Sequence, residues 1–254
     1  MERKEMDLLD YMGENASEKE SPRASRLRPR TLDEVVGQQH IIGKDKLLYR
    51  AIKADKLGSV IFYGPPGTGK TTLAKVIANT TQADFKQINA TVAGKKDMEE
   101  VVSEAKNNMG MYGRRTILFV DEIHRFNKGQ QDYLLPFVED GTIILIGATT
   151  ENPYFEVNAA LISRSIIFEL KSLEISEVKE LILREDNDKP KGMGNYKARI
   201  VENAPDLLAD MAGSDARHAP NAIQLGILLT PRSYYGLPNI HLNAPSHCSQ
   251  KPVF

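Results

Sequence analysis

The sequence contains no tryptophan and a single cysteine, Cys248, among 254 residues. One cysteine excludes a disulfide framework within the chain and a cysteine-ligated zinc site, and it suits a reducing compartment. No apolar run approaches the roughly 20 residues that a membrane-spanning helix needs. The charged segment Met1–Glu5 is not typical of a secretory signal peptide. These features predict no membrane partner and a cytoplasmic location.

Neither sign of charge is in excess, because 33 Lys and Arg residues balance 34 Asp and Glu residues. A formal net charge of −1 gives no global electrostatic attraction to nucleic acid, although a local basic face is compatible with it. The length allows a well-buried core, in one large domain or two smaller ones.

What the sequence does contain is a complete phosphate-binding loop, Gly64–Thr71, with the pattern Gly-x-x-x-x-Gly-Lys-Thr. A short apolar run typical of a buried strand precedes it, and a helical run follows. The glycines let successive backbone N–H groups turn toward phosphate oxygens, and the helix N-terminus adds a positive partial charge. We expect Lys70 to reach the β- and γ-phosphates of ATP and the Thr71 hydroxyl to hold Mg²⁺. The predicted phosphate-binding residues are Gly64, Pro65, Pro66, Gly67, Thr68, Gly69, Lys70, Thr71 and Thr72.

A pair of acids, Asp121 and Glu122, ends the apolar run Ile117–Val120 about fifty residues after the phosphate loop. At the end of a buried strand, adjacent carboxylates are both held in place and accessible. Asp121 is expected to bind Mg²⁺ directly or through water, and Glu122 to accept a proton from an attacking water molecule. P-loop kinases lack such a pair, so hydrolysis is favoured over transfer to a small molecule. His124 follows closely and either lies near the nucleotide or packs and caps locally.

Strand-like and helix-like segments alternate from Leu27 to about Leu170, which predicts an α/β fold with a parallel sheet covered by helices on both faces. The predicted strands are Val60–Tyr63, Phe85–Asn89, Thr116–Val120, Ile143–Gly147 and Ile166–Leu170. The predicted helices are Leu73–Asn79, Lys96–Met109 and Gln130–Glu139.

Four regions follow from composition and patterning. Residues 1–25 predict a flexible polar tail, and residues 26–170 the nucleotide-binding core. Residues 171–229 show helical patterns with no strands between them and predict a small all-α lid, whereas residues 230–254 are rich in Pro, Ser, Asn and His and predict little structure. Within the tail, Met6–Met12 is either a docking motif or a frayed helix.

Taken together, these motifs resemble the AAA+ ATPases of the clamp-loader clade, in particular the replication-associated recombination protein RarA (MgsA) family. The resemblance extends from about Arg23 to Leu229. The segments that carry it are Arg28–His40, Gly64–Thr72, Asp121–Asn127, Gly147–Pro153 and Ala160–Arg164.

The resemblance implies a five-stranded sheet in which the strand 143–147 lies between the two nucleotide-contacting strands. Thr150, or alternatively Thr149, would then orient the attacking water near the γ-phosphate. Arg164 would act in trans, as an arginine finger in the site of a neighbouring subunit, and Arg217 would contact the γ-phosphate from the lid. Adenine would be enclosed by the segment before the phosphate loop, including Val36 and Ile41.

The same resemblance implies a Mg²⁺-dependent ATPase that acts on DNA at stalled replication forks, on single-stranded gaps, ends or forks, in the bacterial cytoplasm near the nucleoid. It implies self-association, and a single-strand-binding protein or sliding clamp as further partners. Glu5–Leu9 faintly resembles a clamp-binding peptide. Two alternatives stay open, namely an ATP-binding interaction module with little turnover and a clamp-loader or branch-migration ATPase subunit. Thr149–Pro153 favours RarA over the latter.

The chain departs from the family pattern toward its end. Family members continue into a C-terminal domain that builds a tetramer, and Thr230–Phe254 resembles an eroded form of the segment leading into it. Ser214 and Pro220 stand where the family has Gly and Leu. Loss of a finger supplied in trans costs about 10³–10⁵ in rate, so we expect MgATP binding with slow turnover in isolation.

Overall fold

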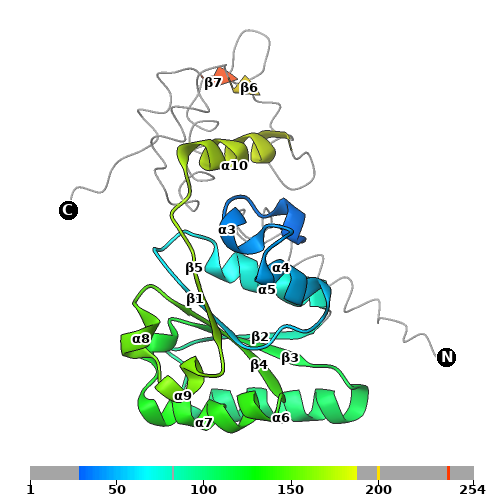
Figure 1. Cartoon of the computed structure of the whole chain (residues 1–254), viewed down its shortest axis with the longest axis vertical. Coiled ribbons are helices and arrows are strands. Elements are labelled where there is room, and N and C mark those ends of the chain that lie inside the picture. Colours follow the sequence, from blue (N-terminus) through cyan, green and yellow to red (C-terminus); the bar gives the residue numbers. More distant parts are fainter. Residues whose placement is uncertain (1–28, 82, 188–198, 201–238, 241–254) are drawn as a thin grey trace, which may run out of the picture. The chain divides into compact units, whose positions relative to one another are not determined.

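The computed structural model describes residues 29–81, 83–187, 199–200 and 239–240. The chain divides into two compact units, and one of them contains the described residues from Pro29 to Glu177. Its centre is a five-stranded parallel sheet with the strand order β2-β3-β4-β1-β5 (Figure 1). The strands are β1 (Val60–Tyr63), β2 (Asp84–Asn89), β3 (Thr116–Asp121), β4 (Ile143–Thr149) and β5 (Ile166–Glu169).

Helices cover both faces of this sheet, as Figure 1 shows. Successive strand residues point to opposite faces, so Val60 and Phe62 enter one hydrophobic cluster and Ile61 enters the other. The helices on the first face are α3 (Gln39–Ile42), α4 (Leu47–Lys53) and α5 (Lys70–Thr81). Those on the second face are α6 (Lys95–Tyr112), α7 (Lys128–Glu139) and the short α9 (Ala159–Ile162), and α8 (Pro153–Glu156) precedes α9.

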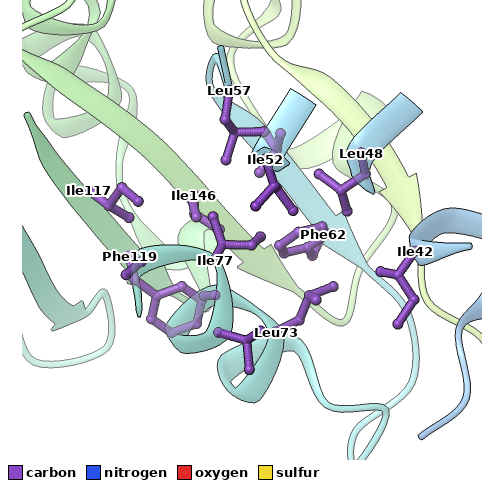
Figure 2. Close-up of a cluster of buried hydrophobic side chains, with 14 of the residues drawn as sticks. Ile42, Leu48, Ile52, Leu57, Phe62, Leu73, Ile77, Ile117, Phe119 and Ile146 are labelled. Atoms are coloured by element: carbon purple, nitrogen blue, oxygen red, sulfur yellow. The ribbon is translucent and has the colours of Figure 1, made fainter. Parts of the chain in front are cut away.

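The first cluster fixes the helix that follows the phosphate loop. Leu73 and Ile77 lie one turn apart on α5 and are fully buried, together with Phe62 of β1 and Phe119 of β3 (Figure 2). Burial of each such side chain contributes about 1.5–3 kcal/mol. The position of the N-terminus of α5, and therefore of the phosphate loop, is set by this packing against β1 and β3.

Every strand of this sheet begins and ends within two residues of its predicted range. β4 lies between β1 and β3, which confirms the order that the family resemblance implied. The helices α5, α6 and α7 extend beyond the predicted ranges, and the added residues are polar, glycine or, at Met111 and Tyr112 of α6, exposed to solvent. α6, for example, ends where Gly113 adopts the left-handed conformation with φ +60°, a common way to terminate a helix.

Two short 3₁₀ turns, η1 (Leu32–Glu34) and η2 (Ile123–Arg125), complete the unit around the sheet. Beyond them, α10 (Ile175–Asn187) lies within the segment 171–229, for which helices were predicted. The strands β6 (Arg199–Ile200) and β7 (Asn239–Ile240) pair in parallel, although the sequence predicted no strand in either segment. The tail, Arg217 and most of the predicted lid and last segment lie outside the described residues, so the four domain boundaries stay predictions.

Candidate nucleotide-binding site

The phosphate loop follows β1 in a conformation that only glycine adopts easily. Gly64, Gly67 and Gly69 have φ values of +145°, +77° and +91°. The Gly64 amide donates to the Thr149 carbonyl at 3.2 Å, which ties the start of the loop to the end of β4. A Cβ on Gly64 would lie 2.1 Å from the Leu170 carbonyl oxygen, whereas a Cβ on Gly69 would meet no atom within 4 Å. The loop is therefore packed at its first glycine and open at its last.

Lys70 lies at the end of this loop and places its ammonium group among the loop carbonyls. Its Nζ donates to the Gly64 carbonyl at 2.7 Å and to the Pro65 carbonyl at 2.9 Å, and the residue is buried. The Thr68 hydroxyl also donates to Pro65 O, at 3.0 Å. These bonds hold the loop curled around the lysine, with a positive charge at its centre.

The start of α5 supplies further groups that suit a phosphate. The helix begins at Lys70, and the Leu73 amide donates to the Gly69 carbonyl at 2.8 Å, so Lys70, Thr71 and Thr72 form its first turn. The side chains of Thr71 and Thr72 are half-buried. Loop amides, a helix N-terminus and a lysine form a donor set that fits a triphosphate.

The carboxyl ends of three neighbouring strands meet beside the loop. β1 leads into the loop, β3 ends at Asp121, and β4 between them ends at Thr149. In parallel α/β sheets this edge is where ligands bind. The Thr71 hydroxyl and the Asp121 carboxylate are oxygen ligands of the kind that Mg²⁺ takes alongside substrate phosphates. Within the described ranges, no cluster of three or more His, Cys, Asp or Glu side chains could hold a metal by itself.

Glu122 lies immediately beyond β3 and adopts the left-handed conformation, with φ +54° and ψ +46°. Its Oε2 lies 3.3 Å from Nδ1 of His124, and the same Nδ1 lies 2.8 Å from the Thr149 hydroxyl. The Thr149 side chain is buried, whereas Thr150 is exposed. Of the two threonines considered for orienting water, Thr149 is therefore the one in contact with the Glu122 turn.

The segment predicted to enclose adenine packs against the loop through a residue that the sequence analysis did not single out. Gln38 is buried, and its Nε2 donates to the Thr68 carbonyl at 3.3 Å and to the Lys171 carbonyl at 2.7 Å, while its Oε1 accepts from the Lys171 amide at 3.0 Å. Val36 is half-buried and Ile41 is buried. The available signal in the sequence was Gly37, because glycine favours positive φ, and the structure gives both Gly37 and Gln38 a positive φ.

Arg164 lies outside this constellation, on the surface after α9. Its Nε forms an ion pair with Glu139 at the end of α7, and its Nη1 donates to the Ser163 hydroxyl at 2.8 Å. Its side chain is 43% exposed, and Nη1 also donates to the Ala160 carbonyl at 3.2 Å, so these contacts do not involve the phosphate loop.

Comparisons with known proteins agree with this geometry. A family model described as the Holliday junction DNA helicase RuvB P-loop domain matches residues 27–161. Replication-associated recombination protein A of Bacillus subtilis is 44% identical over 233 residues, which cover 92% of this chain and 54% of that protein. The protein of the same name from Escherichia coli K12 is 47% identical over 204 residues, covering 80% and 45%. ATPase WRNIP1 of Dictyostelium discoideum is 42% identical over 207 residues, covering 82% and 23%.

Among solved structures, the Thermotoga maritima RuvB Holliday junction branch migration motor superposes with a TM-score of 0.69 at 28% identity, covering 88% of this chain and 72% of that one. The chain spans about half the length of the curated relatives it matches. No helix in the described part of the chain has the length and apolar character to span a membrane. The resemblance to RarA is confirmed, and the chain belongs to the family of RuvB-type P-loop domains within the AAA+ class.

Proposed function

We propose that this chain binds MgATP and hydrolyses it to ADP and phosphate. The observation that carries the proposal is the meeting of three adjacent strand ends, which bring together the phosphate loop, Asp121 with Glu122, and Thr149. A glycine turn without a ligand would not require an acidic strand end beside it. The family membership and the RarA relatives support the same activity.

The chemistry assigns one task to each group. Loop amides and Lys70 bind the phosphate oxygens and offset their charge, and Thr71 and Asp121 would hold Mg²⁺, which neutralises charge on the β- and γ-phosphates. Glu122 accepts a proton from water as the water oxygen forms a bond to the γ-phosphorus. The bond from that phosphorus to the oxygen it shares with the β-phosphate breaks, and its electron pair remains on ADP.

Arg164 is proposed to complete the site of a neighbouring subunit. Its pairing with Glu139 is solvent-exposed, and such pairs contribute only about 0–1 kcal/mol, so exchange for a phosphate costs little. Thr150 or Thr149 would orient the attacking water, and Arg217 would contact the γ-phosphate. The rate of ATP hydrolysis per chain is therefore expected to rise with self-association. Light scattering in the presence of MgATP would detect the self-association.

The partner that we propose for this ATPase is DNA, in replication or recombination at stalled forks, within the bacterial cytoplasm near the nucleoid. The support is the similarity to proteins named for replication-associated recombination and to a Holliday junction motor. A single-strand-binding protein and a sliding clamp are further proposed partners. Steady-state ATPase measurements with and without gapped DNA test this part, and turnover unaffected by gaps, ends or forks would contradict it.

Glu122→Gln tests the chemical step separately from DNA. The substitution keeps the shape of the side chain and removes the base, so the variant should bind MgATP as tightly as the unsubstituted chain while single-turnover hydrolysis falls by at least about 100-fold. Lys70→Ala is the contrasting variant, because it should lose binding itself. Normal hydrolysis by Glu122→Gln would show that the base has been assigned to the wrong residue.

A further inference from the structure

The turn after β3 returns the chain so that two of its side chains face each other. Glu122 stands in the left-handed conformation, which is unfavourable for a residue other than glycine, and η2 follows at once. Ile123 of η2 is fully buried. Its Cδ1 would lie only 3.0 Å from a Cβ added to Gly147 of β4. The turn is thereby held tightly against β4, and the orientation of Glu122 depends on that strand.

His124 joins the same two elements through one atom. Nδ1 lies 2.8 Å from the Thr149 hydroxyl and 3.3 Å from Oε2 of Glu122, and the His124 side chain is only 8% exposed. The Thr149 hydroxyl oxygen also accepts from the Glu151 amide at 3.0 Å, which fixes its position. A simple packing or capping role would not require the ring nitrogen to lie between a carboxylate and the end of β4.

Nδ1 of His124 carries either a proton or a lone pair, so the contact among His124, Glu122 and Thr149 has two possible hydrogen-bonding arrangements. With the proton, Nδ1 donates to the Glu122 carboxylate. With the lone pair, Nδ1 accepts from the Thr149 hydroxyl and leaves Glu122 without that donor. A shift of Thr149 at the end of β4 therefore changes how firmly Glu122 is held.

We propose that His124 is a positioning residue for hydrolysis, which holds the Glu122 carboxylate and couples it to the end of β4. This inference rests on the proposed function, because Glu122 must be the base for its orientation to matter. Thr149 is the coupling element, since it adjoins both His124 and, through its carbonyl, the first residue of the phosphate loop. The phosphate loop makes the proposed contacts with the nucleotide, so the affinity for MgATP should not depend on His124.

Two amide substitutions separate this role from packing. In His124→Asn, the side-chain amide can take the place of Nδ1, whereas in His124→Gln it reaches farther, toward the place of Nε2. Because small misplacements of catalytic groups cost up to about 100-fold in rate, single-turnover hydrolysis should fall by roughly 10- to 100-fold in His124→Gln and His124→Phe. His124→Asn should stay within about threefold of the unsubstituted chain. The dissociation constant for MgATP should be unchanged in all three.

A double variant checks that the effect passes through Glu122. In the Glu122→Gln background, His124→Gln should change the single-turnover rate by less than about twofold, because residues acting as a unit are not additive. Equal rates in the Asn, Gln and Phe variants, or equal losses that follow their thermal midpoints, would overturn the inference. If Glu122→Gln itself hydrolyses normally, the proposed function fails instead. Loss with Glu122→Gln but unaltered rates in the histidine variants rejects only the positioning role.

Discussion

Two glycines of the phosphate loop make opposite predictions when each is replaced by alanine. At Gly64 the added methyl would stand 2.1 Å from the Leu170 carbonyl oxygen, and the φ of +145° is unfavourable for any residue with a Cβ. At Gly69 the φ of +91° is also unfavourable, yet the methyl would meet no protein atom within 4 Å. Both substitutions therefore introduce backbone strain, but only Gly64→Ala also introduces a steric clash.

The expected magnitudes follow from these two terms. Backbone strain of this kind costs about 1–2 kcal/mol, so Gly69→Ala should destabilise the fold by about that amount. Gly64→Ala adds an overlap with a backbone atom that cannot rotate away, which costs about 1–3 kcal/mol more as β5 and the loop shift apart. For a chain of this size each kcal/mol lowers the thermal midpoint by about 2–4 °C.

For MgATP affinity the order of the two variants should be reversed, with the larger loss in Gly69→Ala. The open side of Gly69 lies among the amides that would bind phosphate, so a methyl there should weaken MgATP binding by at least about tenfold, or 1.4 kcal/mol. Thermal unfolding followed by circular dichroism, and calorimetric titration of MgATP at a temperature where both variants are folded, measure the two effects. Equal midpoints for the two variants, or full affinity in Gly69→Ala, would refute the assignment of a packed first glycine and an open last one.

Three further substitutions test the surroundings of the site. Gln38→Ala leaves the amide and carbonyl of Lys171 without their side-chain partner and should destabilise the fold by about 2–4 kcal/mol, with weaker MgATP binding; an unchanged unfolding midpoint would contradict this. Leu73→Ala opens a cavity beneath α5 and should cost about 2–5 kcal/mol in chemical denaturation. Asn127→Ala removes the cap that accepts from the Gln130 amide and should cost about 1 kcal/mol without altering affinity for MgATP.

The sheet was predictable because its central strands are buried on both faces. Ile117–Val120 and Ile143–Gly147 are continuous apolar runs, and such runs between glycine and polar segments indicate buried parallel strands. The edge strand β2 is less buried, so its sequence pattern is a weaker indication of a strand, although Phe85 and Ile88 still indicate one. The helix α4 was not assigned, although Leu48 and Ile52, four residues apart and both buried, carried a helical signal.

The site was predictable where the chemistry is local and not where it depends on distant partners. The phosphate loop is a contiguous motif, so its conformation follows from its glycines. The bonds of Gln38 to Lys171 join residues 133 positions apart, and the contact of His124 with Thr149 joins residues 25 apart. No spacing in the sequence encodes such contacts, because they arise only when strand order brings segments together.

The curled loop around Lys70 is proposed to receive the phosphates of ATP. Isothermal titration of the purified chain with MgATP tests it most directly, with Lys70→Ala as the control and circular dichroism to confirm that both are folded. We expect one nucleotide bound per chain and loss of that binding in the control. A folded chain that takes up no MgATP, or a control that binds equally well, would contradict it.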